Sequence, residues 1–213
     1  MSPRLVCAYA RKYEPDWMVE DLRENMGWVD GFVELDQRDR VTELWSRREE
    51  RVAELRRLAV EAGADWCLII DPDERMEDGA ESSVRRAIEG PPEIRYKFPF
   101  MELWTPDMYR VDGVWGRKTR RRLFHLHAPA GERVLLEDAR IYHLKMIEPK
   151  NRTLRRRVHK QANDWDNRRL GFDYLDDDRG LELRAIEPGR AFSPPYRRYE
   201  FSVPEELLED GDG

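Results

Sequence analysis

Short apolar runs and amphipathic stretches alternate along the first 90 residues of the chain. Apolar runs typical of buried strands occur at residues 5–9, 31–35 and 66–70. The stretches between them carry apolar side chains at helical spacing, which predicts helices at about residues 15–26 and 42–62. With a further helix before residue 90, this order predicts an α/β fold with a mainly parallel central sheet flanked by helices.

The second half of the chain has a more mixed pattern. A further strand falls at residues 94–100, and two more, which we expect to pair antiparallel, fall at 121–127 and 140–144. Residues 101–115 are rich in aromatic residues, proline and glycine, and predict a loop region. A basic helix is expected at about residues 149–169. From residue 171 the chain becomes polar and irregular, and it ends in an acidic tail at residues 205–213.

Composition narrows the class of protein. The 213 residues include 38 Lys plus Arg and 44 Asp plus Glu, which gives a net charge of −6, and 40% are hydrophobic. These values exclude a disordered chain and argue against a general nucleic-acid binder. No apolar run approaches the roughly 18 residues of a membrane-spanning helix, and the first residues are too lightly apolar for a secretory signal. We therefore expect a cytoplasmic protein without an integral membrane segment.

The strongest chemical signal follows the third apolar run. Asp71 and Asp73 are two residues apart, directly after a predicted buried strand, and Pro72 stiffens the turn between them. Two carboxylates placed in this way can approach one hard cation, and an oxygen-rich site suits Mg²⁺ or Mn²⁺, ions that bridge diphosphates. The alternative is an acidic turn that is solvated or caps the next helix.

The carboxyl ends of parallel strands lie along one edge of a sheet, where the ligands of such sheets bind. This order places Tyr9, Asp36 and Asp71 on a common rim. Tyr9 is a candidate to stack on a nucleotide base and Asp36 to accept a hydrogen bond from its edge; a core tyrosine and a turn aspartate are the alternatives. Arg51 shares a helix face with Arg47, and we expect one of them to reach the nucleotide.

The segment ADWCLIIDPDE resembles the DxD segment of family-2 glycosyltransferases with the GT-A fold, which move a sugar from a nucleotide-diphosphate donor to an acceptor. The segments LVCAYA, WSRREERVAELRRLAVEAGA, YRVDGVWGRKTRRRLFHL and IYHLK are similar to segments of the short bacterial and phage-type members. The resemblance covers about residues 4–160. It implies one GT-A-like catalytic domain at 1–170, with a nucleotide-binding half at 1–90 and an acceptor half at 91–170, and an irregular extension at 171–213.

The resemblance also implies roles for individual residues. In this family the second aspartate of the motif holds the donor's metal, which implies Asp73 as a ligand, with Asp71 toward the metal or the donor ribose. A late histidine completes the metal shell, which implies His143; a strand histidine with a satisfied ring is the alternative. Lys145 is a candidate to meet a pyrophosphate oxygen, with a surface lysine as the alternative.

The general base is not marked by a motif, because the chain lacks the family's late Glu-Asp pair at the start of a helix. An inverting transfer needs a carboxylate within hydrogen-bond reach of the acceptor hydroxyl. Glu132, Glu137 and Asp138 are the candidates, whereas a retaining mechanism needs none of them. The implied partners are a nucleotide-diphosphate sugar with Mn²⁺ or Mg²⁺, and a glycan, lipid-linked or protein acceptor.

Two rival functions stay open. A nucleotidyltransferase shares the metal chemistry and the sheet topology, but it normally has a glycine-rich basic loop after the first strand, where this chain has only Arg11 and Lys12. A non-catalytic nucleic-acid-binding protein would use the arginine-rich runs at residues 120–122 and 152–157. A GxGxxG turn and a P-loop are both missing from the sequence, which argues against dehydrogenases and P-loop enzymes.

Overall fold

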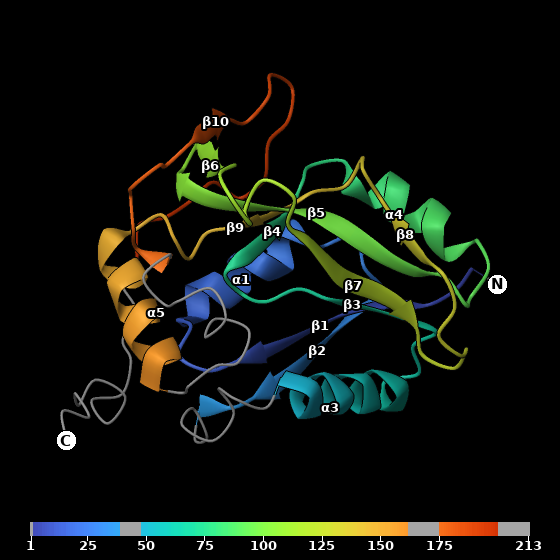
Figure 1. The fold of residues 1–213 in the computed structure, drawn as a ribbon. Helices are drawn as coiled ribbons and strands as arrows, with labels where there is room; N and C mark the ends of the chain where they lie inside the picture. Colours follow the sequence, from blue (N-terminus) through green and yellow to red (C-terminus); the bar gives the residue numbers. More distant parts are fainter. Residues whose placement is uncertain (1, 39–47, 162–174, 200–213) are drawn as a thin grey trace.

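The structure is a computed structural model that describes residues 2–38, 48–161 and 175–199. Its strands are β1 (Leu5–Arg11), β2 (Gly31–Asp36), β3 (Trp66–Ile69), β4 (Glu74–Met76), β5 (Arg95–Thr105), β6 (Met108–Arg110), β7 (Thr119–His125), β8 (Arg133–Leu135), β9 (Ile141–His143) and β10 (Leu183–Ala185). Its helices are α1 (Asp16–Asn25), α3 (Arg48–Glu61), α4 (Ala80–Ile88) and α5 (Pro149–Gln161). The chain is therefore an α/β protein (Figure 1).

One mixed sheet connects all the described strands. Its main path runs β10-β6-β5-β7-β3-β1-β2. Strand β1 pairs in parallel with both β2 and β3, as the sequence predicts, and β7 pairs antiparallel with β3 and β5. Strand β9 departs from the prediction, because it runs parallel to β5 and antiparallel to β4. This arm of β4 and β9 brings the segment after β3 next to the second half of the chain.

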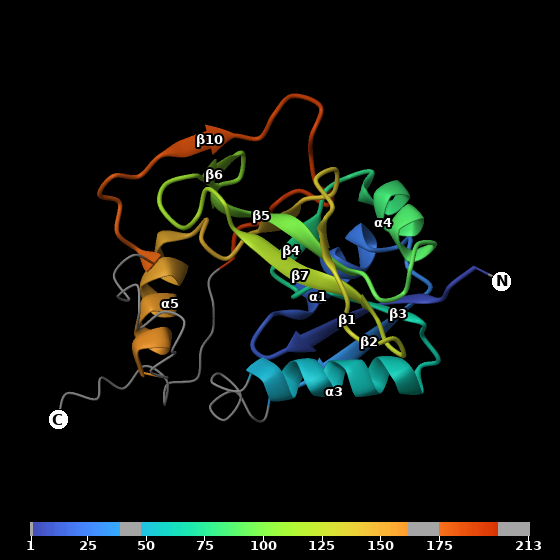
Figure 2. The same cartoon turned by 45° about the vertical axis from the view of Figure 1, so that its right-hand side comes forward.

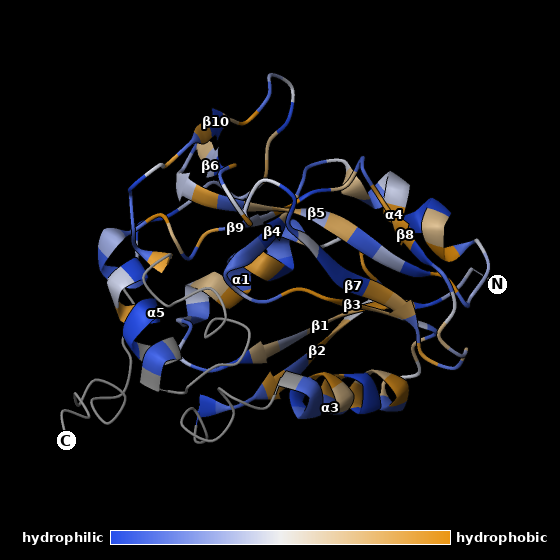
Figure 3. Ribbon diagram, viewed as in Figure 1, coloured by the Kyte–Doolittle hydropathy of each residue, from blue (hydrophilic) through white to orange (hydrophobic). Residues whose placement is uncertain are grey.

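Side-chain alternation along β1 divides the core into two layers. Leu5, Cys7 and Tyr9 face α1 and α4, whereas Val6 and Ala8 face α3. Figures 1 and 2 show α3 on one side of β1–β3, and α1 and α4 on the opposite side. Apolar and polar residues alternate along α3 (Figure 3), so it buries one stripe and exposes the other.

Two sequence expectations need correction. Residues 101–115 are not simply a loop, because β5 continues to Thr105 and β6 follows it. The C-terminal extension is not detached from the domain, because β10 pairs with β6 and the segment after it contacts α1. Arg190 pairs with Glu77 at 2.9 Å, and Asn25 Nδ2 donates a hydrogen bond to the backbone oxygen of Ser193 at 2.7 Å.

Some expectations lie partly outside the described residues. These are the first residues of the helix predicted at 42–62, the end of the helix predicted at 149–169, and the acidic tail. Within the described ranges, no helix is both long and apolar enough to cross a membrane. The two cysteines, Cys7 and Cys67, are buried free thiols.

The central position of β3 generates a prediction about stability. Leu68 is fully buried there, so Leu68→Ala should lower the free energy of unfolding by about 2–5 kcal/mol through the cavity it opens. Val60→Ala is the control, because Val60 is 42% exposed on α3 and its truncation should cost less than about 0.5 kcal/mol. Urea unfolding followed by circular dichroism measures both, and equal losses would contradict this placement of β3.

Candidate functional site

The acidic turn Asp71–Glu74 lies between the central strand β3 and the short strand β4. The Glu74 backbone N–H donates to the Asp71 carbonyl at 2.9 Å, which closes the turn. Strand β4 then pairs with β9, and β9 pairs with β5. As a result Glu74, His143 and Glu102 stand opposite one another on three neighbouring strands. The sheet thus assembles carboxylates and an imidazole from three distant parts of the sequence.

Asp73, His143 and Glu102 form a continuous polar chain in the interior. His143 Nε2 lies 3.4 Å from Asp73 Oδ2, and His143 Nδ1 hydrogen-bonds Glu102 Oε1. The Leu144 N–H donates to the Asp73 carbonyl at 2.9 Å, which fixes the turn against β9. All three side chains are buried, so the orientation of the imidazole is set on both sides.

Lysine and arginine side chains surround these three polar residues. Lys145 Nζ lies 3.3 Å from Asp73 Oδ2 and donates to the Tyr13 hydroxyl at 2.6 Å. On the other side, Lys118 Nζ donates to Glu102 Oε2 at 2.7 Å, and Arg155 from α5 approaches Glu102 Oε1 at 3.3 Å. The site therefore pairs its buried carboxylates with cations from the residue before β7, from α5 and from the segment after β9.

Arg122 of β7 contacts the carboxylates at the two ends of the turn. Its guanidinium lies 3.2 Å from Asp71 Oδ2 and also contacts the Glu74 carboxylate. Glu74 Oε2 accepts a hydrogen bond from the Asp71 N–H at 2.9 Å. Asp71 keeps about a third of its side chain exposed, so it is the carboxylate of the turn that solvent or a ligand reaches.

Beneath the turn, the fully buried Arg75 supports the backbone. It donates to the carbonyls of Pro72 and Glu74 at 2.7 and 2.8 Å, and its charge lies 3.5 Å from Asp21 of α1. Arg197, from the C-terminal segment, approaches Asp21 at 2.9 Å. The position of the turn is therefore tied to α1 and to the far end of the described chain.

The charges of the site shift one another's pKa values. Burial opposes ionisation of Asp73 and Glu102, but the neighbouring cations, led by Lys145 for Asp73 and His143 for Glu102, outweigh it and hold both pKa values well below the usual range. Burial also opposes protonation of His143, yet Glu102 and Asp73 raise the pKa of the imidazole. Burial raises the pKa of Glu74 to about 7, although Arg122 acts in the opposite direction.

Two of the residues brought together, Asp73 and His143, are of types that ligate divalent ions. No group of three or more His, Cys, Asp or Glu side chains that could hold a metal occurs in the described residues. Asp73 Oδ2 and His143 Nε2 lie 3.4 Å apart, which suits two neighbouring ligands of one ion at about 2.1 Å each. In the neutral imidazole, a hydrogen bond from Nδ1–H to Glu102 leaves the Nε2 lone pair for an ion. Mg²⁺ commonly takes few protein ligands and completes its shell with water and substrate phosphates.

The structure brings together four of the sequence-predicted site residues, Asp71, Asp73, His143 and Lys145. Arg51 of α3 lies near them, since its positive charge lowers the pKa of Asp71 and of Lys12. Asp36 lies at the carboxyl end of β2, as expected, where it pairs with Arg38 at 2.9 Å. Asp36 and Asp71 thus both lie at or just after the carboxyl ends of parallel strands, as the sequence predicts.

Tyr9 does not have the predicted placement. It is fully buried in the core layer under α1 and α4. Its hydroxyl donates to Glu34 Oε2 at 2.9 Å and accepts from Arg23 Nε at 2.9 Å. The ring has no exposed surface for a base to stack on, so the core-tyrosine alternative describes it.

The three candidate general bases, Glu132, Glu137 and Asp138, lie away from the turn. Glu132 accepts through its backbone oxygen from the Arg95 N–H, seven residues before Glu102 on β5, a separation of about 23 Å along the strand. Glu137 and Asp138 line a cavity of about 340 Å³ beside α4. These residues lie away from the turn because β8, which separates Glu132 from Glu137, pairs with Arg95–Lys97. That is the end of β5 opposite to Glu102.

Several residues of the site were missed by the sequence analysis, including Glu14, Glu102, Lys118 and Arg122. Glu102 continues the buried alternation of Tyr96, Phe98 and Phe100 along β5, so a carboxylate occupies a position where periodicity predicts an apolar side chain. That mismatch is a signal of a paired, buried charge. Glu14 is buried after β1, where burial raises its pKa and its Oε2 accepts from the Lys12 N–H at 2.7 Å.

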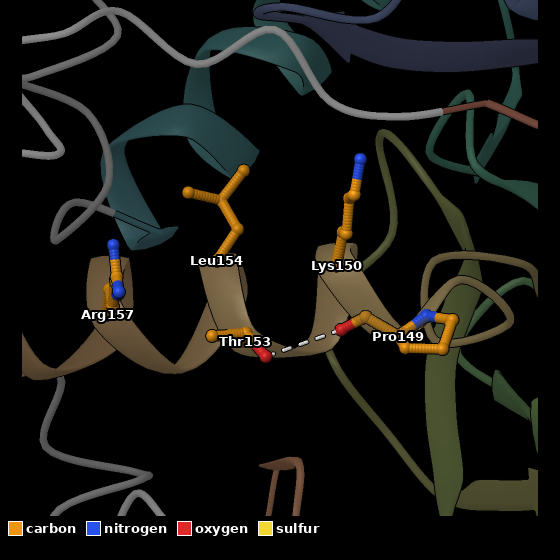
Figure 4. A pocket seen from close by; sticks show the side chains of 5 residues that line it. All are labelled: Pro149, Lys150, Thr153, Leu154 and Arg157. Carbon is orange, nitrogen blue, oxygen red and sulfur yellow. Dashed lines mark hydrogen bonds between the residues drawn. The ribbon is translucent and has the colours of Figure 1, made fainter.

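A separate cavity of about 450 Å³ opens along α5 (Figure 4). Lys150, Leu154 and Arg157 point to the same side of the helix there. Thr153 Oγ1 donates to the Pro149 carbonyl at 3.4 Å on another side. None of the residues of the acidic turn lines this cavity.

The chain matches no protein-family model, and no curated protein matches it at a significant level. The functional assignment therefore rests on the residues themselves and on their geometry.

The polar chain predicts an electrostatic effect of Glu102 on His143. Because the Glu102 carboxylate favours the imidazolium, Glu102→Gln should lower the pKa of His143 in metal-free protein. An NMR titration of the histidine ring protons measures this change. Glu132→Gln is the matched control, since Glu132 is exposed and lies at the other end of β5. An unchanged His143 pKa in Glu102→Gln would contradict the contact.

Proposed function

We propose that the protein is a metal-dependent glycosyltransferase of the GT-A type. It would transfer a sugar from a nucleotide-diphosphate donor to a hydroxyl acceptor, either a glycan, a lipid-linked molecule or a protein. The observation that carries the proposal is the approach of His143 to Asp73 across 70 residues of sequence, at the carboxyl end of a parallel strand. We infer the class of donor, a sugar linked to a nucleoside diphosphate, from the resemblance of the DPDE segment to the family's DxD motif.

The proposed donor site lies at the rim of β1 and β3. Asp73 and His143 would hold Mn²⁺ or Mg²⁺, which supplies positive charge for the diphosphate when bound. Asp71, the most exposed carboxylate of the turn, would face the donor ribose or the ion. Glu102 would keep the imidazole of His143 oriented through Nδ1.

Fixed cations at the rim support a reaction in which a diphosphate leaves. Lys145 is held between Asp73 and Tyr13, and Lys12 lies near enough to Asp71 and Arg51 for each to shift its pKa. Positive groups positioned before the reaction stabilise negative charge as it develops on a leaving group. In the proposed function these lysines bind the pyrophosphate oxygens and favour cleavage of the bond to the sugar.

A nucleotidyltransferase is the second candidate, and the position of Lys12 favours it. This lysine follows the first strand and lies near the acidic turn, where such enzymes place a basic loop. The two reactions release different products. A glycosyltransferase releases a nucleoside diphosphate from a nucleotide-sugar. A nucleotidyltransferase joins the nucleotidyl group of a nucleoside triphosphate to a sugar phosphate and releases pyrophosphate. Assays for both products with Mn²⁺ distinguish them.

Removal of the Asp73 carboxylate tests the site. Asp73→Asn should weaken Mn²⁺-dependent binding of a nucleoside diphosphate by at least about 10-fold, because a hard cation loses a charged oxygen ligand. Calorimetry with UDP, GDP and dTDP, with and without Mn²⁺, measures the effect. Asp138→Asn is the control, because Asp138 is exposed beside α4. Wild-type affinity that is equal with and without metal for all three nucleotides would refute the metal role.

A further inference from the structure

Five cationic side chains gather on the face of the sheet that α3 leaves uncovered. This basic sheet face consists of Arg56, Arg95, Lys97, Arg121 and Arg133. Tyr96 and Phe98 of β5 point into the core under α4, so the residues that alternate with them point to the opposite face. Strand pairing then brings the basic residues of β7 and β8 to the same face. Figure 3 shows hydrophilic stretches on β5 and β7.

The register places like charges directly across from each other. Arg95 stands opposite Arg133, and Lys97 stands opposite Arg121. Arg56 reaches over from α3 and covers the Phe124 ring of β7 at 5.0 Å. Like charges in directly opposed positions destabilise a sheet, so folding alone does not favour this arrangement.

These five side chains have no anionic partner in the part of the chain that the structure describes. None of them forms an ion pair or side-chain hydrogen bond there, in contrast to most other arginines of the protein. The charges that lower the pKa of Arg95, after burial, belong to Arg56, Arg121 and Arg133. In a chain with a net charge of −6, this is a segregated positive surface that is available to an external anion.

The shape and composition of the face select the kind of anion. A single-stranded nucleic acid is bound in a groove with exposed aromatic rings for base stacking. The basic sheet face lines neither of the two cavities described above, and the Phe124 ring is covered by Arg56. Among the described residues the only large exposed apolar side chains are Val60 and Val114. Val60 lies one turn after Arg56 on the same helix face.

We infer that the basic sheet face binds the surface of an anionic lipid bilayer. A sheet face with several separate cations, bordered by an exposed valine, complements a layer of phosphate and carboxylate headgroups with an apolar boundary below it. The contact would be peripheral and electrostatic, and the acidic turn would stay accessible, since it lies at the far end of β5 from Arg95. The inference does not depend on the glycosyltransferase proposal, because no residue of the turn takes part.

The test uses the full chain and vesicles of phosphatidylcholine with and without phosphatidylserine. We expect binding only to the vesicles with phosphatidylserine at about 0.1 M salt, and loss of binding at about 1 M, where the Debye length falls from about 10 to about 3 Å. Each lysine or arginine near a bilayer strengthens binding about fivefold. Lys97→Gln/Arg121→Gln should therefore weaken binding about 25-fold while keeping or raising the melting temperature, because it removes an opposed pair of like charges.

The matched control is Arg86→Gln/Arg184→Gln, which changes the net charge equally at exposed positions on α4 and β10. It should bind the vesicles like the wild-type protein. Equal weakening by both double variants would attribute binding to net charge and overturn the inference. Failure of the wild-type protein to bind vesicles would also overturn it, as would binding of duplex or single-stranded DNA that depends on Lys97 and Arg121 without any binding of vesicles.

Discussion

Charge taken out of water must be paired, and this constraint organises the molecule around Asp73, Glu74 and Glu102. Each of these carboxylates is at most 3% exposed. Removing an ion from water costs several kcal/mol even after the protein relaxes, and only well-placed opposite charges and hydrogen bonds repay that cost. The short arm of β4 and β9 meets this requirement, because it places His143, and Lys145 two residues later, beside the turn. Lys118 and Arg122 approach the same carboxylates from the other side.

The same requirement explains why α1 and the last described segment meet below the turn. Arg75 supports the turn from below and is itself buried, so it needs Asp21 of α1. Asp21 in turn receives Arg197 from the last described segment. A stretch that reads as an irregular polar extension in the sequence is thus a structural part of the domain. Two of its arginines, Arg190 and Arg197, form ion pairs with buried carboxylates of the domain.

The sequence predicts what depends on local pattern, and fails where the outcome depends on distant pairing. The parallel strands β1 to β3 and the DPDE turn follow from apolar runs and their abrupt ends. Tyr9 was misplaced because the side of the sheet that each residue of β1 faces depends on the helices that pack there. Glu132 was misplaced because the register of β8 against β5 is not encoded near either strand. Glu102 was missed because the aromatic and proline content around it conceals the alternation of a long strand.

The distance in sequence between the partners has a consequence for synthesis of the chain. Asp73 leaves the ribosome 70 residues before His143, which corresponds to roughly 4–14 s at about 5–20 residues per second. During that interval the nascent turn has none of the β9 partners that neutralise it in the folded protein, so it must stay hydrated rather than collapse with β3. The acidic turn therefore delays its own burial, and the central sheet can be completed only when the later strands emerge.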